Sequence, residues 1–232
     1  MGKVDLKQFE SADALAQAAA LQWLESLVLS QAQRHSAAFS GGRISEKFFD
    51  SISQQVQERS LQLPEVHFFW ADERCVPPDH PDSNYRMMHL RLLQPLRIPD
   101  AQVHRIKGEL GPAPAARAAS AEFATIVPPA LDSLFLGMGE DGHIASIFPA
   151  DPLDESPADY YRPISNAPKP PPGRVTLAMH AMISARNVCV LVSGAAKEEA
   201  LGKSLKGHRE IPLGRLIADR EFTRVFTNAS PK

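Results

Sequence analysis

The stretch HSAAFSGGRISEKFF, residues 35–49, shows most clearly the strand, turn and helix pattern from which the fold is predicted. Its apolar start, residues 35–40, predicts a short buried strand, and two glycines lead from it into a helix expected over about 44–58. Similar apolar runs alternate with helical patterns along the rest of the chain. Continuous apolar strands separated by helices imply a parallel sheet that is covered on both faces.

Helical and strand patterns alternate on either side of this stretch. The preceding segment, 11–33, opens with Ser11 as its expected N-cap and carries apolar residues at helical spacing. Further along we expect strands over 65–71, 103–106, 131–139, 174–179, 187–194 and 221–228, and helices from near Asp82 or Ser83, over 113–126 and over 195–205. The sequence therefore predicts a single α/β domain, residues 1–232, with a mostly parallel sheet and helices on both faces.

The composition excludes several classes of protein. Hydrophobic residues make up 44% of the chain, and 25 Lys and Arg against 27 Asp and Glu give a net charge of −2, so the basic footprint of a nucleic-acid binder is missing. Uncharged runs fall short of the roughly 20 apolar residues that a membrane helix needs. Asp5, Glu10 and Asp13 stand where a secretory signal would be basic. We expect a cytoplasmic protein, a monomer or weak homo-oligomer, with no membrane or nucleic-acid partner.

Ligands of open parallel α/β sheets bind at the carboxyl ends of the strands, so the loops that follow strands are the first candidates for a site. In FSGGR, residues 39–43, Gly41 and Gly42 let the backbone approach a ligand, and the next helix presents free N–H groups that suit a phosphate. Ser40 and Arg43 flank these glycines. No Gly-Lys-Ser/Thr follows, so the loop is not a Walker motif, and such a turn also occurs as plain chain geometry.

The loop ADERCVPPDHPDSN, residues 71–84, places Asp72 and Arg74 directly after an apolar strand. Two interpretations stay open: these residues bind a substrate, or the loop is a solvated segment in which Arg74 pairs locally. Cys75 is either a nucleophile or a buried cysteine with apolar neighbours.

The loop GMGEDGHIAS, residues 137–146, combines glycines that permit tight turns with one histidine. His143 has an ordinary pKa near 6.5, which suits proton transfer at neutral pH. Glu140 and Asp141 precede it. A lone histidine is also often structural, so this loop alone does not decide between a catalytic and a structural role.

Arg174, which opens RVTL, and Lys197, at the start of a helix, add cations beside further strands. Together with two glycine-rich strand ends and His143, they predict a site for a phosphorylated small molecule. The eight histidines show no metal-ligand spacing, so we expect no metal and no cofactor. The segment NAPKPPPG, residues 166–173, is either a flap over this site or a surface connection.

Five motifs occur in order over residues 39–201 and resemble those of the 6-phosphogluconolactonases: FSGGR, ADERCVPPDHPDSNYRMM, FLGMGEDGHIASIFP, GRVTLAM and VLVSGAAKEEAL. The resemblance implies an α/β fold shared with sugar-phosphate isomerases and deaminases. It also implies metal-free hydrolysis of 6-phosphoglucono-δ-lactone to 6-phosphogluconate, the second step of the oxidative pentose phosphate pathway. The expected partner is therefore a small sugar phosphate.

The resemblance suggests a mechanism. His143 activates water as a general base and then protonates the departing ring oxygen, while Asp141 or Glu140 orients the imidazole. Arg74 contacts the lactone carbonyl or the sugar hydroxyls, where a fixed cation stabilises developing negative charge.

The same resemblance places the phosphate on the N–H groups of Gly41 and Gly42, with Arg174 and Lys197 neutralising its charge. This chain departs from the family there. The family usually has Ser-Gly-Gly-Ser-Thr-Pro, whereas Arg43, Ile44 and Ser45 follow the glycines here, so the backbone cradle is retained but a side-chain contact to the phosphate is altered.

Two rival functions remain. Glucosamine-6-phosphate deaminases look similar, but their histidine is typically followed by Ile-Ala-Phe-Asn-Glu-Pro, whereas residues 144–149 read IASIFP. They also carry Asp-Glu-Tyr where residues 72–74 read DER. Both differences favour the lactonase. A non-catalytic sugar-phosphate sensor would need a DNA-binding module, and the helix expected over 11–33 is single and not basic.

Overall fold

The computed structural model describes residues 2–30, 32, 34–127, 129–149, 151 and 159–231, and its main feature is a seven-stranded sheet in which every pairing is parallel. In spatial order the strands are β1 (Lys3–Gln8), β10 (Phe222–Thr227), β9 (Asn187–Val192), β6 (Ser133–Gly137), β2 (Arg34–Phe39), β3 (Glu65–Trp70) and β5 (Val103–His104). The predicted α/β fold with a mostly parallel sheet is confirmed.

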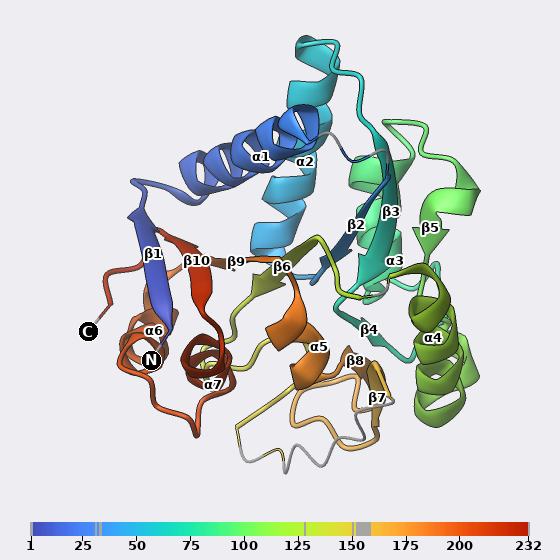
Figure 1. Cartoon of the computed structure of the whole chain (residues 1–232). Helices are drawn as coiled ribbons and strands as arrows, with labels where there is room; N and C mark the ends of the chain where they lie inside the picture. Colours follow the sequence, from blue (N-terminus) through green and yellow to red (C-terminus); the bar gives the residue numbers. More distant parts are fainter. Residues whose placement is uncertain are drawn as a thin grey trace.

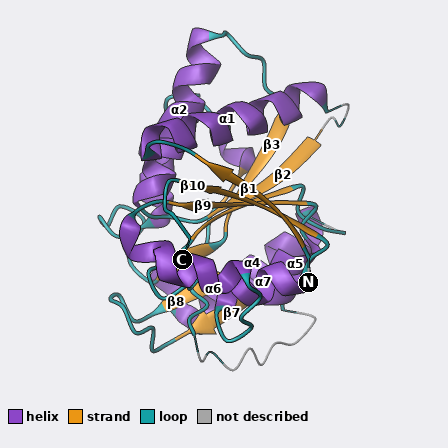
Figure 2. Ribbon diagram, turned by 90° about the vertical axis from the view of Figure 1, so that its left-hand side faces the viewer, coloured by secondary structure: helices purple, strands orange, loops and turns teal. Residues whose placement is uncertain are grey.

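Helices cover both faces of this sheet (Figures 1 and 2). The first face carries α1 (Ala12–Leu29) and α2 (Arg43–Glu58), which pack on each other, and α3 (Asn84–Met88) contacts α2 and runs into a π-helical turn, His89–Leu93. The other face carries α4 (Pro112–Ile126), α5 (Met179–Ser184), α6 (Glu198–Leu205) and α7 (Pro212–Asp219). Short 3-10 turns also occur at Asp100–Gln102, Gly108–Leu110 and Ala195–Lys197.

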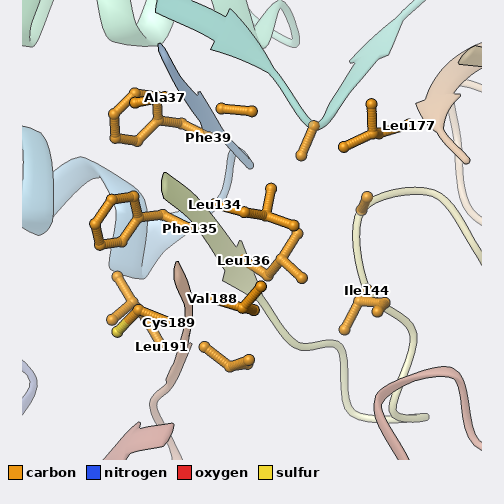
Figure 3. Packing of buried hydrophobic residues seen from close by; sticks show 14 of the residues in the cluster. Ala37, Phe39, Leu134, Phe135, Leu136, Ile144, Leu177, Val188, Cys189 and Leu191 are labelled. Carbon is orange, nitrogen blue, oxygen red and sulfur yellow. The ribbon is translucent and has the colours of Figure 1, made fainter. Parts of the chain in front are cut away.

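The core forms because the central strands are apolar on both sides. In β2, Ala37, Ala38 and Phe39 are fully buried, as expected for a strand between two helical layers. The ring of Phe39 stacks on Phe135 of the neighbouring β6 with centroids 5.3 Å apart, and Figure 3 shows the two rings side by side. This packing fixes the strand ends from which the glycine-rich loops begin.

A second, antiparallel sheet contains β4 (Asp72–Arg74), β8 (Arg174–Leu177) and β7 (Tyr161–Ile164), and Figure 1 shows β7 and β8 next to α5. The expectation that residues 174–179 join the parallel sheet is therefore wrong. The segment is an apolar strand, but it pairs with β4, placing Arg174 opposite Arg74. This pairing brings the end of the proline-rich segment back to Arg74 and Cys75, at the end of β4.

The sequence did not predict β1, β4, β7 and α7. Strand β1 reads KVDLKQ, is mostly exposed at the sheet edge and lacks an apolar run. Helix α7 is short, beginning at Pro212 in the position that tolerates proline. The strand expected over 103–106 is limited to Val103–His104.

Among the helices of the described residues, none combines the length and the apolar character needed to cross a membrane.

Candidate active site

A cavity of about 390 Å³ lies at the carboxyl ends of β9, β6, β2 and β3, the four strands from the middle of the sheet. Its wall takes Ser193 after β9, Met138 after β6, Ser40 after β2 and Asp72 after β3. Strand order reverses between β2 and β6, because the chain first builds outward to β5 and then returns to the other side of β2. Such a switch point is where open α/β sheets bind ligands.

Nine of the predicted site residues line this one cavity: Ser40, Gly41, Gly42, Arg43, Asp72, Arg74, His143, Arg174 and Lys197. The two others, Glu140 and Asp141, line a neighbouring cavity of about 710 Å³. Asp141 nevertheless contacts His143 from behind, whereas Glu140 makes no hydrogen bond to it in the described structure. Of the two carboxylates expected to orient the imidazole, the geometry selects Asp141.

His143 and Asp141 form a hydrogen-bonded pair. Nδ1 of His143 lies 2.5 Å from Oδ1 of Asp141, and the His143 backbone N–H donates to the same oxygen at 3.3 Å. An ionised carboxylate only accepts, so Nδ1 carries the proton and Nε2 is left with its lone pair. Within the described structure Nε2 has no hydrogen-bond partner, and it is therefore available to a molecule in the cavity.

The surroundings keep His143 neutral and Asp141 charged. Burial lowers the pKa of His143 below its ordinary value, an effect that Asp141 opposes and Lys169 reinforces. Burial alone would raise the pKa of Asp141, but the hydrogen bond and charge of His143, with Lys169, bring it below its ordinary value. A neutral imidazole backed by a carboxylate is the arrangement of a general base.

The glycines around His143 are required by close packing. A side chain at Gly139 would overlap the imidazole ring, so only glycine lets the loop fold under it. The loop closes through the Gly139 N–H, which donates to the His143 carbonyl at 2.9 Å. Phe148 covers another side of the ring, with centroids 4.6 Å apart. Two residues after the histidine, Ala145 has a φ of 48°, a left-handed conformation that costs energy for a residue with a Cβ.

The loop after β3 is held by buried hydrogen bonds. Asp72 accepts from Ser146 Oγ at 2.7 Å, and its backbone carbonyl accepts from Asn84 Nδ2 at 2.8 Å. Burial raises the pKa of Glu73 to about 7, opposed by backbone N–H donors of Tyr85, Asn84 and Arg74. Glu73 thereby ties the start of α3 to β4 and fixes the Asp72–Arg74 segment.

The cations differ in how they are held. Arg74 donates from Nη1 to the Asp82 carbonyl at 2.7 Å. Arg174 is buried, and its guanidinium donates to the backbone carbonyls of residues 169–171. Arg43 and Lys197 have no ion-pair or hydrogen-bond partner for their side chains in the described part of the chain, and burial, then Arg43, lower the pKa of Lys197. Two unpaired cations at one cavity favour an anionic ligand.

Polar atoms without partners also point into this region. Ser40 Oγ, Arg74 Nε and Asn84 Oδ1 are buried and have no hydrogen-bond partner among the described residues. Burying such groups unpaired is costly, and all three residues line the cavity. A polyhydroxylated ligand would supply the missing donors and acceptors.

Sequence reasoning missed three residues of this region. Asn84 lies in the motif after β4 but was not singled out, although it lines the cavity. Lys47 also lines it, paired with Asp13 at 2.6 Å; its spacing of four from Arg43, which places both on one face of α2, could have revealed it. Lys169 of the proline-rich segment lies 3.9 Å from Asp141 Oδ2.

Two alternative chemistries find no support in the geometry. Burial, then the charge of Glu73, raise the pKa of Cys75 to about 11, so its thiol stays protonated near neutral pH and is a poor nucleophile. Within the described ranges no group of three or more His, Cys, Asp or Glu is placed to hold a metal ion.

Comparisons with a family model and with known proteins place the chain in the same family. Residues 10–225 match the family model of glucosamine-6-phosphate isomerases/6-phosphogluconolactonase. A probable 6-phosphogluconolactonase 3, chloroplastic, of Oryza sativa subsp. indica is 33% identical over 183 residues, covering 72% of this chain and 54% of the relative. The 6-phosphogluconolactonase of Treponema pallidum (strain Nichols) is 35% identical over 184 residues, covering 76% and 75%. The match thus spans about half the length of the chloroplastic relative.

Solved structures share the whole fold. The 6-phosphogluconolactonase of Trypanosoma brucei superimposes with a TM-score of 0.81 at 26% identity, covering 97% of this chain and 96% of that one. A monomeric glucosamine-6-phosphate deaminase reaches 0.80 at 19% identity, covering 97% of each chain, so the fold alone does not separate the two activities. Because the family model covers nearly the whole chain, this protein belongs to the glucosamine-6-phosphate isomerase/6-phosphogluconolactonase family.

Proposed function

We propose that this protein hydrolyses 6-phosphoglucono-1,5-lactone to 6-phosphogluconate. The observation that carries the proposal is the His143–Asp141 pair, which presents a free imidazole nitrogen to a cavity that also holds unpaired cations. The names of the relatives from Oryza and Treponema agree with it. A lactone is an activated ester, so one base and a polarising cation are sufficient for its hydrolysis.

In the proposed mechanism His143 handles both proton transfers. Nε2 accepts a proton from water as the water oxygen attacks the lactone carbonyl carbon. The resulting imidazolium, stabilised by Asp141, donates that proton to the ring oxygen as the bond between this oxygen and the carbonyl carbon breaks. The products are the carboxylic acid, which ionises, and a free hydroxyl group, and His143 returns to its neutral form.

Arg74 is the proposed stabiliser of the negative charge that develops on the carbonyl oxygen. Its guanidinium is anchored on the Asp82 carbonyl and its buried Nε has no partner among the described residues, so it is a fixed donor at the cavity. Fixed donors are effective because they need no reorganisation during the reaction.

The phosphate is proposed to lie at the start of α2, between Arg43 and Lys197. Gly42 is the N-cap of α2 with a φ of 103°, and no side chain caps this helix. Its first N–H groups and the helix dipole therefore favour an anion. Arg174, whose donors are mostly bonded to the chain itself, contributes charge rather than a new set of hydrogen bonds.

The deaminase remains the rival function, and the region after His143 argues against it. Ser146, Ile147 and Phe148 carry no carboxyl group and are buried, where the deaminases that this chain resembles have Phe-Asn-Glu. Asp72 is the one carboxylate among the described residues of the cavity wall, and its Oδ2 accepts from Ser146.

We also propose that the protein acts in the cytoplasm as a single domain and as a monomer or weak homo-oligomer.

Phosphate dependence tests the proposal. We expect kcat/KM for 6-phosphogluconolactone to exceed that for unphosphorylated gluconolactone by at least about tenfold, because one charge-assisted contact is worth roughly 1.5–3 kcal/mol. The measurement is initial acid release from each fresh lactone, corrected for the enzyme-free rate. Equal kcat/KM values for the two lactones would show that Arg43 and Lys197 do not bind the phosphate.

Lys197→Met is expected to raise KM for the phosphorylated lactone by about tenfold to a hundredfold with little change in kcat. Burial and the neighbouring cations already disfavour the charge on Lys197, so the variant should melt no lower than the wild type. Lys206→Met removes an exposed lysine from the same region of sequence and serves as the matched control. An unchanged KM in Lys197→Met would remove this residue from the phosphate site.

A further inference from the structure

The proline-rich segment, residues 166–173, is fixed against the active site by Arg174. The Nη2 group of Arg174 donates to the carbonyls of Lys169 and Pro170 at 2.9 and 3.3 Å, and Nε donates to that of Pro171 at 3.1 Å. At the last residue of the segment, the Gly173 carbonyl accepts from the Cys75 N–H at 2.9 Å. The segment therefore has a defined path beside the cavity.

Arg174 also connects this segment to His143 through an aromatic ring. Its guanidinium lies over Phe148 at 5.6 Å from the ring centroid, and Phe148 packs on the imidazole at 4.6 Å. One buried arginine thus contacts both the proline-rich segment and the ring that covers His143. Lys169 and His143 are therefore linked through the contacts of Arg174 and Phe148.

Lys169 uses this position to reach Asp141. Its Nζ lies 3.9 Å from Oδ2 of Asp141, whereas Oδ1 of the same carboxylate accepts from Nδ1 of His143 at 2.5 Å. The two oxygens of Asp141 thus face two different partners. Both side chains of the ion pair are partly exposed, 47% for Lys169 and 36% for Asp141, so the pair contributes little to stability by itself.

We propose that Lys169 is a positioning residue for the reaction: its ammonium group, beside the outer oxygen of Asp141, offsets the negative charge of this carboxylate, so that the His143 imidazole stays neutral and Nε2 is free to accept a proton. This proposal depends on the proposed function for its catalytic consequence only. The contact between Lys169 and Asp141, and its electrostatic effect on His143, are properties of the protein without substrate.

The charge of Lys169 changes the pKa of His143 in a direction that can be predicted. His143 faces Asp141 on its own loop, Lys169 on the proline-rich segment and Asp72 on β4. The described part of the cavity wall adds five cations: Arg43, Lys47, Arg74, Arg174 and Lys197. Lys169 lowers the pKa of His143, and the carboxylates raise it. Removing the charge of Lys169 should therefore raise the pKa of His143. The imidazole would then become protonated, and stop acting as a base, at a higher pH than in the wild type.

The experiment is an NMR titration of the His143 imidazole in wild type and in Lys169→Met, Lys169→Arg and Lys206→Met. The His143 resonance is identified by its loss in His143→Asn. We expect the midpoint to move to higher pH in Lys169→Met, to return toward wild type in Lys169→Arg, and to stay unchanged in the exposed control Lys206→Met. Melting temperatures check that each variant is folded.

A midpoint in Lys169→Met that stays at the wild-type pH or falls would overturn the proposal, as would an Arg variant that behaves like the Met variant. In the lactone assay, the acid limb of kcat/KM should move in the same direction as the NMR midpoint. A shifted midpoint in a protein that hydrolyses no lactone would contradict the proposed function and leave the assignment of Lys169 intact. The two failures are thus distinguishable.

Discussion

Replacing His143 with asparagine is expected to lower kcat for 6-phosphogluconolactone by at least about a hundredfold, because a positioned general base contributes roughly 10² to 10⁴ to the rate. The loss is one of proton transfer, since the smaller side chain still fits above Gly139 and next to Phe148. The imidazole is buried against Asp141 but anchors no strand or helix, so the fold should survive. KM should change much less than kcat.

The measurement is initial acid release by purified His143→Asn, with His208→Asn as the control. His208 is exposed and pairs with Glu210 at 2.8 Å, so it tests the same substitution away from the cavity. Circular dichroism and melting temperature establish that both variants are folded. Near-normal turnover in folded His143→Asn would exclude this residue as the base.

The parallel sheet was predictable because its central strands are apolar runs. Residues 35–40, 65–71 and 187–194 read as buried strands, and the structure has β2, β3 and β9 there. β1 was not predictable in this way, since a mostly exposed edge strand lacks such a run. The strand at Arg174–Leu177 was recognised, but a sequence pattern does not specify a strand's partner.

The candidate site was predictable where glycines and charges follow strands. Glycine-rich loops at the ends of β2 and β6 pointed to the cavity, because parallel strands bring their carboxyl ends to one edge. The contact between Lys169 and Asp141 was not predictable, because it depends on the path of the proline-rich segment, whose carbonyls Arg174 binds. Likewise, the choice of Asp141 over Glu140 needed the turn at Gly142, which has a φ of 81°.

Assaying the wild-type protein on two substrates in parallel distinguishes the lactonase from the deaminase. Hydrolysis of 6-phosphogluconolactone releases an acid, whereas deamination of glucosamine 6-phosphate releases ammonia and requires ring opening and proton abstraction next to a carbonyl. This chain has Arg74 and the buried Ser146–Phe148 segment where the deaminases that it resembles have Tyr and Phe-Asn-Glu. This chain therefore lacks the phenol and the carboxyl group that the deaminase motifs carry at these positions.

The lactone opens spontaneously, so the assay compares acid release with and without protein at slightly acid pH, where the background is slower. We predict acid release well above the enzyme-free rate, lost in His143→Asn, and no ammonia from glucosamine 6-phosphate. Ammonia formation without faster lactone opening would contradict the proposed lactonase function, together with the roles proposed for Arg74 and His143.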